Sequence, residues 1–280
     1  MTLPMTSRTL AALGAALVLS ACGIDLETTA VQDITAPADG GYVRFFNFAS
    51  GAGAASAAPS VNFYAGDTKV TAINSATGVE AASGVAYGGV GNGGLYSNLK
   101  PGPYTFAGRI IGAPVDNGLP ISQIAATVAP GKYYSVYQSG LYDAVNKVSD
   151  GFVVEDPIPA AFDFSQAYIR FVHASSNSNA MTLTVTNTVS TVAFTIGEAI
   201  GYKKASGFST VPAGTYNIAG ACGTTCNSTG AGNATTAVTR TGITVSAGRY
   251  YTIALRGDVT LNPATTTLAN RLQFDFSANR

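Results

Sequence analysis

The apolar residues of this chain occur in short runs separated by turn residues. Residues 133–137 and 250–255 are typical: they are rich in tyrosine, valine and isoleucine, and Gly131 or Gly248 lies just before each run. Short runs rich in β-branched and aromatic residues, entered from a turn, predict β-strands. After the N-terminal segment, no apolar repeat of helical period is longer than about two turns. The pattern therefore predicts an all-β protein.

Three of these segments occur twice, in the same order. Tyr-Val-Arg-Phe is followed later by Tyr-Ile-Arg-Phe, Gly-Pro-Tyr by Gly-Thr-Tyr, and Gly-Lys-Tyr-Tyr by Gly-Arg-Tyr-Tyr. The matching segments are residues 42–50 and 168–176, 96–108 and 208–220, and 128–136 and 245–253. This order indicates a duplication with insertions in loops. Because a repeat of about 115 residues has the size of one immunoglobulin-like sandwich, we predict two tandem antiparallel β-sandwich domains of the immunoglobulin-like type.

The N-terminal segment has the pattern of a secretory signal. Arg8 precedes an uncharged apolar run over residues 10–19, and Leu-Ser-Ala-Cys follows, ending at Cys22. An apolar run of about ten residues is too short to span a membrane. Leu-Ser-Ala-Cys resembles the lipobox of bacterial lipoproteins, which implies cleavage before Cys22, lipidation of Cys22 and anchoring to a membrane. Gly23 favours the outer membrane, on its periplasmic or its surface face; an ordinary signal peptide with an incidental cysteine is the alternative.

The predicted organisation has five parts. They are a signal peptide (1–21), a lipidated and flexible tether (22–40), a first sandwich (41–154), a linker (155–166) and a second sandwich (167–280). The tether is polar and poor in aromatic residues, and Pro157 and Pro159 stiffen the linker.

Charge is scarce in this sequence. Charged residues make up 11% of the 280 residues, with 15 basic and 15 acidic side chains. Soluble domains carry about 25% charge, so we expect threonine, serine and asparagine at outward positions of the strands and valine, isoleucine, tyrosine and phenylalanine at inward ones. The composition argues against nucleic-acid binding, which needs a basic face. Net charge also offers no attraction to a charged partner.

Catalytic residue types are nearly absent. His173 is the one histidine, and it lies close to Ser175 and Ser176 at the end of a predicted strand. A hydrolase of this kind needs a Gly-x-Ser-x-Gly turn, which is missing, and the first repeat has Asn47 at the position of His173. We therefore predict a hydrogen-bonding role for His173 and no enzymatic activity.

Metal and cofactor sites are not predicted either. One histidine and scattered carboxylates do not supply the ligands of a transition-metal site. A calcium site among Asp143, Asp150, Glu155 and Asp156 lacks the spacing of a calcium-binding loop. Residues 89–94 fit Gly-x-Gly-x-x-Gly, but a dinucleotide site needs a helix after these glycines. Because a strand is predicted there instead, we interpret this segment as a flexible loop.

Cys222 and Cys226 lie in a loop rich in glycine, threonine and asparagine. In a secreted protein such a pair predicts a disulfide that holds the loop, with free thiols or a redox role as alternatives. The tyrosine pairs at 133–134 and 250–251 are interpreted as core residues rather than as a platform for sugars, because neighbouring side chains on a strand point to opposite faces.

The repeated segments also resemble a known family. Tyr-Ile-Arg-Phe-Val-His-Ala-Ser (168–175), Val-Pro-Ala-Gly-Thr-Tyr (211–216) and Ala-Gly-Arg-Tyr-Tyr-Thr (247–252) are similar to the repeats of domain of unknown function 4397, a family of bacterial envelope and secreted proteins. The resemblance departs at residues 176–180, and it implies no catalytic residue. We expect an envelope lipoprotein that acts as a non-enzymatic structural or binding module for an envelope protein or polymer. A carbohydrate-active or hydrolytic protein and a mechanical spacer are the alternatives.

Overall fold

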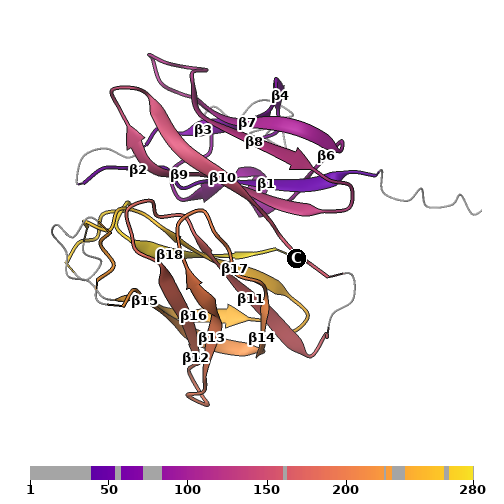
Figure 1. Cartoon of the computed structure of the whole chain (residues 1–280), viewed down its shortest axis with the longest axis vertical. Helices are drawn as coiled ribbons and strands as arrows, with labels where there is room; N and C mark the ends of the chain where they lie inside the picture. The colour runs from indigo at the N-terminus through magenta and orange to yellow at the C-terminus, as the bar shows by residue number, and fades with distance from the viewer. Residues whose placement is uncertain are drawn as a thin grey trace, which may run out of the picture. The chain divides into compact units, whose positions relative to one another are not determined.

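The computed structural model describes residues 39–53, 58–71, 84–159, 163–223, 225–228, 237–261 and 265–279. Within these ranges the chain consists of β-strands, loops and one 3₁₀ turn (Figure 1). The all-β prediction is confirmed, and the strands form sheets arranged as sandwiches.

Strands β1 to β10 form the two sheets of the first repeat (repeat 1). They are β1 (Gly41–Asn47), β2 (Ser50–Gly51), β3 (Val61–Ala65), β4 (Thr68–Lys69), β5 (Gly89–Val90), β6 (Ser97–Leu99), β7 (Gly102–Ile110), β8 (Pro120–Val128), β9 (Tyr133–Asp143) and β10 (Val148–Glu155), with the 3₁₀ turn η1 at Gly91–Gly94. We call the sheet of each repeat that packs against the other repeat the inner sheet, and the second sheet the outer sheet. The inner sheet has the order β10-β9-β1-β5; in addition, β6 pairs with β1, and β2 pairs with β9. The outer sheet has the order β4-β3-β7-β8.

The second repeat (repeat 2) has the same plan. Its strands are β11 (Gln166–His173), β12 (Met181–Asn187), β13 (Ala193–Ile200), β14 (Ser209–Pro212), β15 (Gly214–Ala221), β16 (Ala237–Val245), β17 (Tyr250–Arg256) and β18 (Gln273–Ala278). The inner sheet has the order β14-β11-β17-β18, and the outer sheet has the order β13-β12-β15-β16. Since β11, β17 and β18 occupy the places of β1, β9 and β10, the duplicated sequence is also a duplicated topology.

The central strands of each inner sheet run parallel to each other. β1 pairs with β9, which places Arg44 opposite Ser135, and β11 pairs with β17, which places Arg170 opposite Thr252. Parallel strands need a long connection, and here the strands of the outer sheet lie between them in the chain. The hydrophobic pattern does not predict this pairing, because it identifies a strand but not the direction of its neighbour. The strand pairs of the outer sheets are antiparallel, as predicted.

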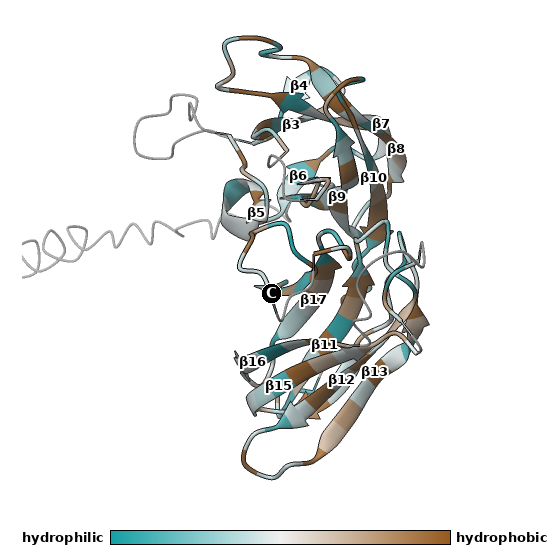
Figure 2. Ribbon diagram, turned by 90° about the vertical axis from the view of Figure 1, so that its left-hand side faces the viewer, coloured by the Kyte–Doolittle hydropathy of each residue, from teal (hydrophilic) through white to brown (hydrophobic). Residues whose placement is uncertain are grey.

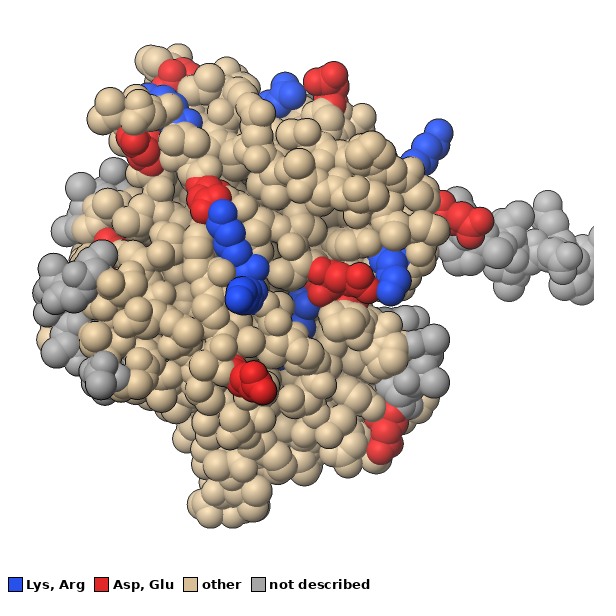
Figure 3. Space-filling model, viewed as in Figure 1, with Lys and Arg blue, Asp and Glu red and all other residues tan. Residues whose placement is uncertain are grey.

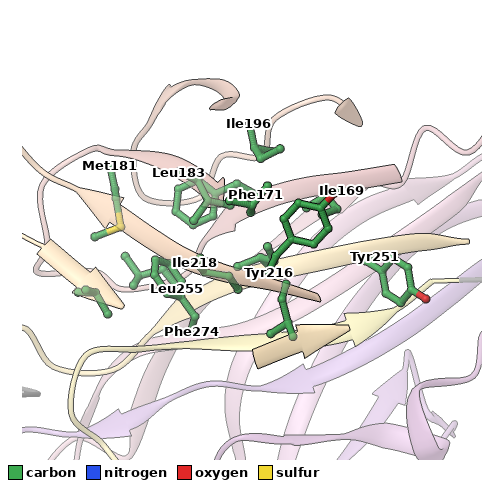
Figure 4. Packing of buried hydrophobic residues seen from close by; sticks show 14 of the residues in the cluster. Ile169, Phe171, Met181, Leu183, Ile196, Tyr216, Ile218, Tyr251, Leu255 and Phe274 are labelled. Atoms are coloured by element: carbon green, nitrogen blue, oxygen red, sulfur yellow. The ribbon is translucent and has the colours of Figure 1, made fainter. Parts of the chain in front are cut away.

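Each repeat encloses a hydrophobic core between its sheets. In repeat 1, Phe45 packs against Phe63 and Phe106 at ring distances of 5.2 and 5.6 Å. Figure 4 shows the core of repeat 2, where Phe171 and Leu183 belong to the same cluster of buried residues as Phe274.

The strands β1, β11 and β17 of the inner sheets are buried on both faces. Val43 and Phe45 on β1 belong to the core of repeat 1, whereas Phe46 belongs to a separate cluster with Val172 and Ala254 of repeat 2. Strands buried on both faces carry apolar residues in succession rather than in alternation. On the ribbon of β11, hydrophobic segments lie on both sides of a hydrophilic one (Figure 2). The polar outward face expected from the composition is therefore replaced on these sheets by a contact between the repeats.

The tyrosine pairs lie in this packed structure at equivalent places. Tyr133 stacks on Tyr42 at 4.7 Å, and Tyr250 stacks on Tyr168 at 4.4 Å. Gly131, just before the first pair, has φ of +69°, as does Gly248 before the second, a conformation that favours glycine. The prediction that these tyrosines serve packing is confirmed for Tyr250 and Tyr251, which are both buried.

Candidate functional site

Two arginines at equivalent positions lie buried where the inner sheets face each other. The side chains of Arg44 on β1 and Arg170 on β11 are 0% exposed. The Arg44 guanidinium lies 5.0 Å from the Phe46 ring and 5.1 Å from the Tyr96 ring, and that of Arg170 lies 5.3 Å from Phe208. A buried charge is costly unless it is paired and hydrogen-bonded. These arginines therefore require partners at the contact.

Asp156 supplies the charge that both arginines share. Its side chain is buried directly after β10, and it forms an ion pair with Arg170. Arg44 Nε lies 3.5 Å from Asp156 Oδ2, and the Ser135 hydroxyl donates to the same oxygen at 2.7 Å. The Tyr96 hydroxyl also donates to Asp156. Burial, followed by the charge of Asp156, raises the pKa of Tyr96, so this hydroxyl remains a donor at neutral pH.

Each arginine donates a hydrogen bond to the backbone of the other repeat, and the two acceptors lie at equivalent places. Arg44 Nη1 donates to the carbonyl oxygen of Ala278 at the end of β18, at 2.9 Å. Arg170 Nη1 donates to the carbonyl oxygen of Glu155 at the end of β10, also at 2.9 Å. Thr252 accepts from Arg44 Nη2 at 3.2 Å and from Arg170 Nε at 3.0 Å. Each repeat thus holds the last strand of the other.

Asn279 occupies in repeat 2 the place that Asp156 has in repeat 1. The Thr252 hydroxyl donates to Asn279 Oδ1 at 2.7 Å, just as Ser135 donates to Asp156. We call this cluster the arginine site; it comprises Arg44, Arg170, Asp156, Asn279, Ser135, Thr252 and Tyr96. Among the described residues it contains two cations and one anion. Apart from Tyr96, which is half-buried, its residues are buried. They bond to one another, so the arrangement fixes two sheets rather than presenting reactive groups to solvent.

A polar rim joins the repeats beside the arginine site. The Tyr202 hydroxyl donates to Asp150 Oδ2 at 3.1 Å and lies 2.9 Å from the Ser139 hydroxyl. Lys203 pairs with Asp150 at 2.7 Å. Burial raises the pKa of Tyr202. Because Tyr202 and Lys203 belong to repeat 2 and Asp150 and Ser139 to repeat 1, this rim adds specificity to the contact.

The segment after β17 contacts repeat 1 at a third place, through hydrogen bonds. Asp258 accepts a hydrogen bond from the Gly53 N–H at 2.7 Å, and Asn177 donates to Asp258 at 2.8 Å. Asn270 donates to the carbonyl oxygens of Gly51 and Gly53 at 3.0 and 2.8 Å. Burial acts to raise the pKa of Asp258, but the hydrogen bonds to its carboxylate outweigh burial and lower it. A charged Asp258 is therefore part of the contact at neutral pH.

His173 lies buried at the end of β11, as a hydrogen-bonding residue. Its Nε2 lies 3.0 Å from the Ser178 hydroxyl and 3.1 Å from the carbonyl oxygen of Asn179. Burial lowers the pKa of His173 to about 4. The Ser175 hydroxyl donates to the carbonyl oxygen of Gly257 at 2.8 Å, so it does not pair with His173. This geometry agrees with the role predicted from Asn47 in repeat 1.

Cys222 and Cys226 form a disulfide with Cα atoms 4.8 Å apart, in agreement with the pairing predicted from the sequence. Both residues belong to the core cluster of repeat 2. The Asn179 N–H donates to the carbonyl oxygen of Cys226 at 2.8 Å, and Asn179 Nδ2 donates to that of Thr225 at 2.9 Å. Because His173 bonds the same Asn179, the disulfide and the histidine support one loop cluster.

The other candidates from the sequence have separate surroundings. Asp143 accepts hydrogen bonds from the backbone of its own turn at Val145, at 2.8 Å, while Glu155 pairs with Lys132 at 2.8 Å. In the part of the chain that is described, no three acidic, histidine or cysteine side chains are placed to hold a metal ion. Residues 89–94 form β5 and η1 and are followed by β6, so the helix that a dinucleotide site requires is not found there.

Cys22 and the rest of the signal sequence lie outside the described residues, so the lipidation remains a prediction. Over the residues that the structure does describe, no helix has the length and hydrophobicity needed to cross a membrane.

The arginine site was not identified from the sequence, although one signal pointed to it. Arg44 and Arg170 are identical in both repeats and lie in the middle of apolar strands. A charge in such a position must be paired in a buried site. The sequence gives no indication of the partner, because Asp156 lies 112 residues after Arg44 in what was predicted to be a linker.

Comparison with known proteins gives a family but no activity. A family model described as "Domain of unknown function (DUF4397)" matches residues 53–184 and residues 167–275, as two overlapping copies. No curated protein matches the chain.

Proposed function

Because the chain belongs to the family of domain of unknown function 4397, with two tandem copies and no activity attached to that description, we propose its function from its own structure. It is a non-enzymatic binding or structural module of the bacterial envelope, anchored by lipid at Cys22, most favourably to the outer membrane. The observation that carries this proposal is the arginine site, which joins the two repeats through buried, crossed hydrogen bonds.

The arginine site supports a binding module because of what it does to geometry. Two domains joined by a linker alone sample many relative orientations, whereas domains joined by a buried contact hold their outer sheets and loops in a fixed relation. A partner that contacts both repeats then loses less conformational freedom when it binds. The buried groups of the site are consumed by this task and are not available for chemistry on a substrate.

The surface is consistent with a module whose partner is recognised by shape and local groups. Figure 3 shows charged residues singly or in small groups on a face that is otherwise uncharged. A protein with balanced charge is not steered to its partner over long distances. Attachment to a membrane would instead supply a high local concentration at the envelope.

Two experiments test this proposal. Replacing Cys22 by Ser should abolish acyl labelling and release the chain from the membrane fraction; unchanged fractionation would show that the anchor is wrong.

Cross-linking in intact envelopes, followed by mass spectrometry, should capture a reproducible partner. Replacement of Asp156 by Asn should weaken this capture, whereas replacement of the exposed Lys100 by Gln serves as a control and should not. Capture that is the same with all three chains would contradict the role of the fixed geometry.

A further inference from the structure

The outer sheet of repeat 1 carries a shallow furrow over β7 and β8. Uncharged residues on the outer face lie opposite each other across β7 and β8: Pro103 opposite Thr127, Thr105 opposite Ala125, and Ala107 opposite Gln123. Two hollows of about 420 and 220 Å³ lie along this line and share Thr105. From Gln123 to Thr127 the furrow extends about 14 Å, at ~3.4 Å per residue.

Arg109 lies at one end of the furrow, and its guanidinium is oriented by a neighbouring ring. The Arg109 guanidinium lies 4.3 Å from the centre of the Tyr64 ring, and stacking of this kind orients the planar group. Its nearest acidic group is Asp67, at 3.6 Å, and the side chain of Asp67 is fully exposed. The Arg109 side chain is 33% exposed, so part of its guanidinium faces solvent, whereas its Nε is buried and has no hydrogen-bond partner among the described residues. An exposed ion pair of this length contributes little, so Arg109 keeps donors for another anion.

The equivalent face of repeat 2 lacks both groups. Ala221 follows Gly220 as Arg109 follows Gly108, and Thr184 pairs with Ala219 as Tyr64 pairs with Ala107. The arginine and the aromatic ring therefore are not demanded by the fold of a repeat. They are a local feature of repeat 1.

The strands beneath the furrow determine which kind of chain fits it. The backbone of β7 is already paired on both sides, with β3 and with β8. An extended peptide gains affinity by adding to a free strand edge, and over β7 it would find no free backbone groups. What the furrow offers instead are hydroxyl and amide side chains, at Thr105, Thr127 and Gln123, and the guanidinium of Arg109.

We propose that this furrow binds a carboxylate-bearing polysaccharide. A carboxylate of one sugar unit takes the Arg109 guanidinium, displacing the weak contact with Asp67, and hydroxyls of the neighbouring units bond to the threonine and glutamine side chains. This inference rests on the proposed function, since it names the ligand of the binding module. The test of this ligand is independent of the test of the lipid anchor, because release from the membrane does not depend on Arg109.

The test is calorimetric titration of the purified full chain with three probes of matched length. They are an oligogalacturonate, a neutral cello-oligosaccharide and an oligoglutamate peptide. The proposal expects binding of the oligogalacturonate that weakens as salt is raised, and at least tenfold weaker binding of the other two. No binding of the oligogalacturonate, or equal binding of the peptide, would overturn it.

Variants of opposite effect sharpen this test. Arg109→Gln should weaken binding about tenfold, because a charge-assisted pair is lost. Asp67→Asn removes the competing carboxylate and should strengthen binding several-fold. Arg249→Gln makes the same charge change on repeat 2, at an exposed position, and should leave binding unchanged. Equal effects of the two arginine changes, or weaker binding in Asp67→Asn, would overturn the assignment of Arg109.

Discussion

The two repeats share one fold but fill the same interior place with opposite chemistry. In repeat 1, Gln138 donates to Asn47 at 3.0 Å and accepts from Ser122 at 2.8 Å, beside Gly108. In repeat 2, the position next to the equivalent glycine, Gly220, is filled by Met181 and Phe274.

This difference shows what the fold requires at that place. In both repeats a glycine leaves room for side chains from neighbouring strands, since an added Cβ would lie 1.8 Å from Gln138 Oε1 at Gly108 and 2.1 Å from Met181 Sδ at Gly220. A buried amide network is tolerated when its members satisfy one another. The fold therefore depends on the space and on satisfied bonds, not on whether the filling is polar or apolar.

The largest expected effect concerns Asp156, the charge of the arginine site that has an uncharged counterpart, Asn279, in repeat 2. Replacing Asp156 by Asn should destabilise the chain by about 3–5 kcal/mol, because both buried arginines lose their counter-charge. Urea unfolding followed by circular dichroism measures this change. A loss below about 1 kcal/mol would contradict the role given to Asp156.

A second substitution, at the position of repeat 2 that is equivalent to Asp156, tests whether the loss of stability comes from the missing charge. Adding Asn279→Asp to the Asp156→Asn chain returns one carboxylate to the arginine site, from repeat 2 instead of repeat 1. Because Thr252 already donates to residue 279, we expect at least half of the lost stability to return. No recovery would mean that the two positions are not equivalent.

A smaller effect concerns His173, which stands where repeat 1 has Asn47. The pKa of His173 is about 4 in the folded chain and ordinarily about 6.5 when unfolded. Between these values the unfolded state binds more protons, so stability falls as the pH is lowered from 6.5 to 4, by about 3 kcal/mol over the whole interval.

Replacing His173 by Asn, the residue of repeat 1, should remove this part of the pH dependence and leave that of the carboxylates. Thermal unfolding of both chains at pH 7, 5.5 and 4.5 provides the measurement. Parallel curves for the two chains would show that His173 does not titrate with folding.

The smallest effect concerns the disulfide, which only repeat 2 contains. Replacing both Cys222 and Cys226 by Ser should cost about 2 kcal/mol, since a short loop restricts the unfolded chain only modestly. The polar hydroxyls would also enter a buried cluster. If reduction of the unmodified chain leaves its unfolding midpoint unchanged, the disulfide does not support the loop around Asn179.

The sequence predicts what neighbouring residues determine. Strands such as 133–137 and 250–255 follow from local composition, and the disulfide follows from two cysteines four residues apart. The role of His173 followed from comparing it with Asn47. The parallel pairing of β1 with β9 could not be predicted, because a strand's pattern does not specify its neighbour.

The contact between the repeats depends on still longer separations. Arg44 bonds the carbonyl oxygen of Ala278, which is 234 residues away in the chain. Its apolar surroundings resemble those of any buried strand, so the pattern does not distinguish a face that covers a core from one that covers another domain. The residues of the furrow were also missed, because Tyr64 and Arg109 come together only through the register of β3 with β7.

The central claim is that the arginine site makes the two repeats one structural unit. Differential scanning calorimetry of the full chain tests it directly, by comparing the calorimetric enthalpy of unfolding with the van't Hoff enthalpy. We predict a single transition in which the two enthalpies agree, and a separation into two transitions in the Asp156→Asn chain. Two independent transitions in the unmodified chain would contradict this account.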